Sequence, residues 1–139
     1  MGATNFQSMY APNGNGKNAK GKCVSRQAQV ADTAADNAAK ACKTERGTTE
    51  VSIAAFETKY GTNPNKKNAL GKCVSSMANA TVEAQHDATM NAAKKCKAER
   101  GTTTQGIAAF NDEYGTNANK RNAFGKCVSK LAKQQNSSS

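Results

Sequence analysis

The sequence predicts an all-α protein: a tandem helical repeat array of long helix–short helix–long helix units that share their long helices and are stapled by disulfides. Three observations support this fold class. A polar phrase occurs three times, helix-ending glycines recur at the same points of its copies, and cysteines recur in step with both. Much of the apolar content is alanine, which buries little area, so repeated units with covalent links are expected to support a thin core.

The repeated phrase fixes the frame of the array. It reads YGTNPNKKNALGKCVS from Tyr60, YGTNANKRNAFGKCVS from Tyr114 and, more loosely, YAPNGNGKNAKGKCVS from Tyr10. The second and third copies extend backwards through a C-K-x-E-R-G-T-T segment that the first copy lacks. We therefore divide the chain into a truncated first repeat with its linking helix (1–41), a second repeat with its linking helix (42–95), a third repeat (96–133) and a disordered tail (134–139).

Glycine and threonine mark the ends of the short helices. Gly47 closes a helix with a basic last turn, as glycines in the left-handed conformation commonly do. A short helix follows, which Thr48 or Thr49 caps and Gly61 ends. The third copy repeats these signals around Gly101, so it is expected to contain the same short helix.

Asparagine and proline signal the start of each long helix. Asn63 is expected to cap a helix that begins at Pro64 and runs for about 35 residues, and Asn13 and Asn117 take the same role in the other copies. A glycine recurs inside each long helix, at positions 21, 71 and 125. Glycine costs a helix about 1 kcal/mol relative to alanine, so another helix is expected to pack closely at these positions.

Helix geometry restricts how the cysteines pair. Two cysteines on one long helix, such as Cys23 and Cys42 or Cys73 and Cys96, would be about 28 to 34 Å apart, too far for a disulfide. The consistent pairing is Cys42–Cys73 and Cys96–Cys127, because the two cysteines of each pair are 31 residues apart and bracket a short helix. This pairing leaves Cys23 as an unpaired thiol that is either buried or linked to another chain. Disulfides favour an oxidising compartment, so a secreted or cell-surface protein is expected.

The charge of the chain favours anionic partners. The formal net charge is +10 and the sequence pI is about 9.6. Such a charge attracts nucleic acid, anionic lipid or acidic polymers, although basic helix faces also serve only to solubilise a protein. No window of about 18 apolar residues predicts a membrane span. No signal peptide is visible after Met1, so a cytoplasmic protein is the alternative to a secreted one.

Basic residues recur where each long helix is expected to begin. Cations at a helix N-terminus oppose the helix dipole, whereas free N–H groups and basic side chains together attract anions. Repeated sites of this kind would bind a polyanion through avidity, unless these residues serve only solubility. The candidate anion-binding residues are Lys17, Lys20, Lys22, Lys66, Lys67, Lys72, Lys120, Arg121 and Lys126.

No residue pattern predicts catalysis or metal binding. No C-x-x-C motif occurs, and the one histidine, His86, is remote from any cysteine pair in the sequence. Asp112 and Glu113 have no acidic counterpart in the second copy, which argues against a repeated active site. We therefore predict no enzyme, no cofactor and no metal.

The phrase YGTNANKRNAFGKCVS, preceded by AAKKCKAERG, resembles repeats of uncharacterised secreted proteins of actinobacteria. The resemblance covers nearly the whole chain and implies an exported protein with paired cysteines; it implies no catalytic residue. We expect a non-enzymatic, secreted helical repeat module with a structural or adhesive binding role towards anionic polymers. The alternative is a nucleic-acid-binding protein that contacts the duplex backbone. A dimer or longer assembly linked through Cys23 is a further expectation.

Overall fold

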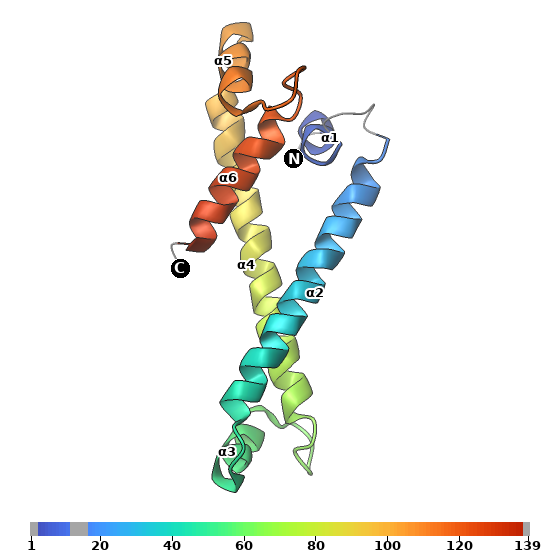
Figure 1. Ribbon diagram of the computed structural model, residues 1–139, viewed down its shortest axis with the longest axis vertical. Helices are drawn as coiled ribbons and strands as arrows, with labels where there is room; N and C mark the ends of the chain where they lie inside the picture. The colour runs from blue at the N-terminus through green and yellow to red at the C-terminus, as the bar shows by residue number, and fades with distance from the viewer. Residues whose placement is uncertain (1–2, 12–16, 138–139) are drawn as a thin grey trace. The chain divides into compact units, whose positions relative to one another are not determined.

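The computed structural model describes residues 3–11 and 17–137, and this part of the chain is helical with no strand (Figure 1). The all-α fold class is therefore confirmed. The two longest helices contain 28 and 32 residues. In chain order the helices are α1 (Ala3–Tyr10), α2 (Ala19–Arg46), α3 (Glu50–Tyr60), α4 (Ala69–Arg100), α5 (Thr104–Tyr114) and α6 (Ala123–Ser137).

The chain forms two compact units. The central unit comprises Gln27–Ala84: the second part of α2, all of α3 and the first part of α4. The terminal unit comprises Met1–Arg26 and Gln85–Ser139, so it combines the two ends of the sequence. Within the terminal unit, α6 contacts both α1 and α5. The sequence predicts repeat boundaries after residues 41, 95 and 133, where the copies of the repeated phrase divide. The two compact units divide the chain at other positions, so the repeat boundaries stay a prediction.

Each unit is closed by one disulfide. Cys42 is bonded to Cys73 in the central unit, and Cys96 is bonded to Cys127 in the terminal unit. This is the pairing that the helix spacing predicts. All four of these cysteines are fully buried, whereas Cys23 is a half-buried free thiol. The two intramolecular disulfides indicate an oxidising environment.

Each hydrophobic core lies around its disulfide. The core of the central unit is small: Phe56 and Ala69 pack with Cys42 and Cys73, and Tyr60, Leu70 and Val74 lie against them. The core of the terminal unit is larger, because α1 and α6 add apolar side chains to those of α4 and α5. Its members are Met9, Ala92, Ala93, Cys96, Phe110, Ala123, Phe124, Cys127 and Val128.

The short helices begin and end at the residues that the sequence indicates. Thr49 caps α3 by accepting a hydrogen bond from the Ser52 N–H at 3.2 Å, and Gly61 follows the last turn. Gly47 and Gly101, which follow α2 and α4, have φ values of 66° and 61°. These two residues therefore adopt the left-handed conformation predicted for helix-closing glycines.

The starts of the long helices differ from the prediction. α4 begins at Ala69 and not at Pro64, and α6 begins at Ala123, because the asparagine side chains organise the preceding residues into turns, described below. The predicted cap at Asn13 lies outside the described residues. At the other end of the chain, α6 continues to Ser137, whose hydroxyl donates to the Lys133 carbonyl, so the helix extends into the predicted tail 134–139.

No helix within the described parts of the chain is both long enough and apolar enough to cross a membrane.

Candidate functional site

The residues before α4 and α6 form two structured loops, 61–68 and 115–122, which we call the connecting loops. In the first, the Asn68 side-chain oxygen accepts hydrogen bonds from the N–H groups of Thr62 (3.1 Å) and Asn63 (3.4 Å), and its amide donates to the Thr62 hydroxyl (2.6 Å). Asn122 makes the same three bonds in the second loop, at 3.0, 3.4 and 2.6 Å. The recurrent asparagine therefore acts as the organising residue of each loop.

Two of the nine candidate anion-binding residues are held inside these loops. Lys66 and Lys120 are half-buried and have left-handed backbones, with φ values of 56° and 55°. Their ammonium groups donate to the carbonyls of Gly61 (3.0 Å) and Gly115 (3.1 Å). These contacts give the two lysines a role in holding the loop, which the sequence reasoning did not anticipate.

The other candidate residues are exposed. Lys67 and Arg121 follow the left-handed lysines, and their backbone N–H groups donate to the side chains of Asn65 and Asn119, both at 3.1 Å. The remaining members lie before the helices or in their first turns: Lys17, Lys20 and Lys22 at α2, Lys72 at α4 and Lys126 at α6.

We expect Asn122→Ala to lower the free energy of unfolding of the terminal unit by about 1–2 kcal/mol, because two loop N–H groups lose their acceptor. Urea denaturation followed by circular dichroism measures this loss. Asn122→Asp keeps the acceptor oxygen and removes only the donor to Thr116, so it should cost less than the alanine variant. Equal stability of Asn122→Ala and the wild type would contradict this role of the asparagine.

The positive charge is concentrated in one unit. The terminal unit contains 13 basic and 4 acidic residues, a formal net charge of +9, whereas the central unit contains 7 basic and 6 acidic residues, a net charge of +1. The contact between the two ends of the chain contributes to this segregation, because residues 1–26 carry four bases and no acid.

A stripe of lysines runs along α6. Lys126, Lys130 and Lys133 are exposed and spaced at i, i+4 and i+7, which places them on one face of the helix. No acidic residue occurs in α6. The Lys130 ammonium also lies 5.5 Å from the centre of the Tyr114 ring. The sequence reasoning missed Lys130 and Lys133 because it followed only the repeated phrase, although their helical spacing was visible.

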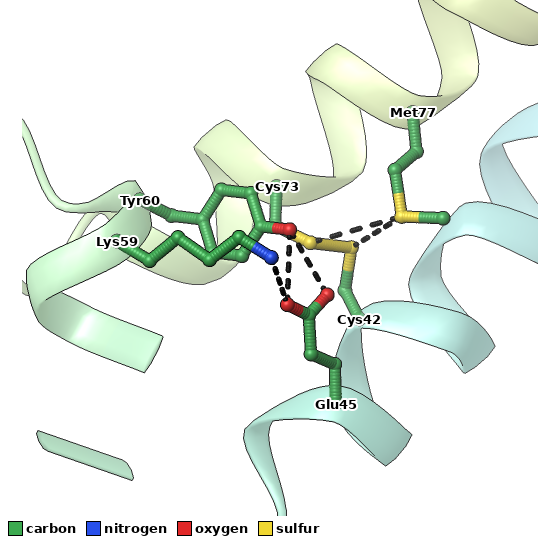
Figure 2. A network of polar contacts seen from close by, with 6 residues as sticks. All are labelled: Cys42, Glu45, Lys59, Tyr60, Cys73 and Met77. Atoms are coloured by element: carbon green, nitrogen blue, oxygen red, sulfur yellow. Dashed lines mark hydrogen bonds and ion pairs between the residues drawn. A yellow bond between two sulfur atoms is a disulfide. The ribbon is translucent and has the colours of Figure 1, made fainter. Parts of the chain in front are cut away.

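A second recurrent arrangement joins each short helix to the end of the preceding long helix. In the central unit, the Tyr60 hydroxyl donates to the Glu45 carboxylate at 2.9 Å, and Lys59 forms an ion pair with the same carboxylate (Figure 2). The hydrogen bond from Lys59, followed by that from Tyr60, lowers the pKa of Glu45, and the same contact raises the pKa of Lys59. Glu45 and Lys59 are exposed and Tyr60 is half-buried, and their contacts join the end of α3 to the end of α2.

The terminal unit repeats the tyrosine–glutamate contact. The Tyr114 hydroxyl donates to Glu99 at 2.8 Å, and this hydrogen bond is the main cause that raises the pKa of Tyr114 to about 12. The pairs Glu45–Tyr60 and Glu99–Tyr114 are each 15 residues apart. This shared spacing is the signal that would have revealed the contact in the sequence.

The sulfur atoms of the central unit lie beside this network. The Met77 sulfur is 3.4 Å from Cys42 Sγ and 3.9 Å from Cys73 Sγ, and Met77 comes from α4, one turn after Cys73 (Figure 2). Leu131 occupies the corresponding position after Cys127. Met77 therefore covers the disulfide on one side.

The expected close helix contact at the recurrent glycines is wrong for Gly21 and Gly71. A Cβ atom added at either position would meet no atom within 4 Å, so both glycines face open space. The helix cost of glycine there is not offset by packing within the chain, and we have no physical account of it.

Within the described residues, no group of three or more histidine, cysteine, aspartate and glutamate side chains is arranged to hold a metal ion. Comparison with protein-family models, with curated proteins and with solved structures found no match to this chain.

Proposed function

We propose that the protein is a non-enzymatic, disulfide-stapled helical repeat module that is secreted or displayed at the cell surface and binds anionic polymers through its terminal unit. The observation that carries this proposal is the segregation of charge: the terminal unit has a net charge of +9 and the central unit +1. A concentrated field of one sign raises the local concentration of oppositely charged ligands, whereas evenly spread charge mainly aids solubility.

The lysine stripe of α6 is the proposed contact surface. Lys126, Lys130 and Lys133 point from one face of a helix without an acidic residue, so an extended anionic chain can contact all three. This proposal changes the set of anion-binding residues expected from the sequence. Lys66 and Lys120 donate to carbonyls of their own loops, whereas Lys126 belongs both to the sequence-based set and to the lysine stripe.

The two disulfides support a secreted role, because such bonds persist in oxidising compartments. The resemblance to secreted two-cysteine repeats agrees with that placement. The matched connecting loops and matched tyrosine–glutamate contacts support the proposal that the chain is a tandem array of one unit.

Duplex nucleic acid is the second candidate ligand, and the lysine stripe is also the observation that favours it. Phe110 and Phe124 are buried, so neither offers a platform for stacking bases. Contact with nucleic acid would then be made to the phosphate backbone of a duplex, and it would depend on salt and not on sequence.

Binding to heparin, poly(glycerol phosphate) and a short DNA duplex, each measured over a salt series, tests the proposal. We expect a variant with Lys126, Lys130 and Lys133 all changed to Gln to bind more weakly, and its log–log salt slope for duplex DNA to fall by about 2–3. The control variant changes Lys40 and Lys43 of the central unit to Gln and should change binding little. Its matched counterpart changes only Lys130 and Lys133 to Gln, an equal loss of charge, and should weaken binding.

Equal weakening by the two double variants would show that net charge alone drives binding. Failure of the wild-type protein to bind any of the three probes at low salt would remove the proposed function. Preference for one probe over the others at the same salt concentration identifies the class of polymer.

A further inference from the structure

A methionine thioether lies against the disulfide of the central unit. The Met77 sulfur is 3.4 Å from Cys42 Sγ and 3.9 Å from Cys73 Sγ, so it contacts both atoms of the bond. In Figure 2 the disulfide lies between the Met77 side chain and the ring of Tyr60, which packs against the core around the bond. Both cysteines are 0% exposed, so a covering side chain has to move before another molecule can reach either sulfur.

Met77 itself is open to solvent. It is 37% exposed, whereas Met9 is 8% exposed and Met90 is half-buried. A peroxide converts the apolar thioether of an accessible methionine into a polar sulfoxide. Of these three methionines, Met77 is therefore the one that we expect a peroxide to oxidise first.

The disulfide of the terminal unit has a different neighbour. Leu131 stands four residues after Cys127, as Met77 stands four residues after Cys73. Leu131 packs against the core that contains the Cys96–Cys127 bond, and its side chain has no sulfur that a peroxide could oxidise. Two disulfides at equivalent points of the repeat therefore differ in the side chain beside them, which is oxidisable in the central unit.

We propose that Met77 is an oxidation site that controls the access of thiols to the Cys42–Cys73 disulfide. In its reduced form the thioether covers the bond and keeps thiols away from it. A sulfoxide oxygen requires water or a hydrogen-bond donor, and the buried sulfur atoms of a disulfide offer neither. The oxidised side chain therefore turns into solvent and leaves the bond uncovered. The inference does not depend on polyanion binding, which we assign to residues of the terminal unit.

The proposed sequence consists of two reactions with different reagents. In the first, the Met77 sulfur takes one oxygen atom from hydrogen peroxide: the O–O bond breaks, an S=O bond forms, and water leaves. In the second, the thiolate of a small thiol attacks one sulfur of the uncovered disulfide, and the other cysteine leaves as a thiolate and takes up a proton. A second thiol then displaces the first as a small disulfide, so both cysteines end as free thiols.

The response is confined to the unit that depends most on its covalent link. The core around the Cys42–Cys73 bond has Phe56 and Ala69 as its other buried members, so reduction of the bond loosens the central unit. The terminal unit keeps its disulfide and its larger core. Peroxide followed by thiol thus opens one unit of the protein and leaves the other closed.

The rates at which the two disulfides are reduced test the proposal on the full chain. A Cys23→Ser protein is used, so that the free thiol does not consume peroxide. It is treated with hydrogen peroxide, desalted and exposed to dithiothreitol without denaturant. Alkylation of the released cysteines and peptide mass spectrometry measure the reduction of each bond separately and locate the added oxygen.

We expect peroxide to oxidise Met77 before Met9 and Met90. After oxidation, the disulfide of the central unit should be reduced at least about tenfold faster than before, because the attacking thiolate gains access to its sulfur atoms. The disulfide of the terminal unit should be reduced at an unchanged rate, and it serves as the internal control.

Variants of the methionines separate the cover from its oxidation. Met77→Leu copies the terminal unit, so the central disulfide should be reduced slowly both before and after peroxide treatment. Met77→Ala removes the cover without oxidation, so reduction should be fast from the start. Met90→Leu is the matched control, because it removes a half-buried methionine elsewhere on α4 and should leave the response to peroxide unchanged.

Equal reduction rates before and after oxidation of Met77 would overturn the proposal, as would a Met77→Leu protein that still responds to peroxide. A Met77 that stays reduced while the other methionines are oxidised would also contradict it. Circular dichroism separates uncovering from unfolding, since the oxidised protein should keep its helix content until thiol is added. Loss of helix before that step would count against the proposal, because unfolding would then explain the faster reduction.

Discussion

Replacing Cys42 and Cys73 together with alanine is expected to lower the free energy of unfolding of the central unit by about 3–4 kcal/mol. The bond closes a loop with a sequence separation of 31 residues, so its loss releases a large conformational entropy in the unfolded chain. The remaining core of the central unit consists mainly of Phe56 and small side chains, which cannot replace that contribution. Urea denaturation of the double variant, followed by circular dichroism, measures the loss.

The corresponding change of Cys96 and Cys127 should leave more residual structure, because the terminal unit has a larger core that includes Phe110, Phe124 and Val128. Cys23→Ala is the control and should change stability little. An unchanged denaturation midpoint after loss of the Cys42–Cys73 bond would show that the helices of the central unit do not need their covalent link.

Replacing Phe110 with alanine is expected to destabilise the terminal unit by about 3–5 kcal/mol. Phe110 is 3% exposed and lies in the core with the Cys96–Cys127 disulfide, so the change leaves a cavity beside a rigid bond. It also removes the tilted ring contact with Tyr114, whose centroid is 4.8 Å away. The shift of the thermal or urea midpoint gives the magnitude.

Val51→Ala is the matched control for this experiment. Val51 is 81% exposed on α3, so its truncation should change the free energy of unfolding by no more than about 0.5 kcal/mol. A similar small effect for Phe110→Ala would contradict the assignment of this ring to a packed core.

The features that the sequence predicts well are those set by local rules or by simple distance limits. Gly47 and Gly101 end their helices because left-handed backbone favours glycine, and Thr49 caps α3 because its side chain reaches a free N–H group. The disulfide pairs follow from the shared separation of 31 residues around each short helix, and two cysteines on one long helix lie too far apart to bond.

The features that the sequence does not predict depend on longer contacts. Asn63 and Pro64 are a good local signal for a helix start, but the side chain of Asn68 bonds back to the N–H groups of Thr62 and Asn63 and holds a loop there. The terminal unit reaches its net charge of +9 when residues 1–26, with a net charge of +4, join residues 85–139, with a net charge of +5, and no local pattern encodes this contact. The lysine stripe of α6 is visible in the sequence as helical spacing, but its place in the more basic of the two units required the fold.

The left-handed lysines of the connecting loops show how a strained backbone position is kept without glycine. Lys66 and Lys120 have φ values of 56° and 55°, a conformation that costs a residue with a side chain about 1–2 kcal/mol. Each lysine offsets that cost by donating to the carbonyl of Gly61 or Gly115, so the strained residue itself supplies the bond that holds its loop closed.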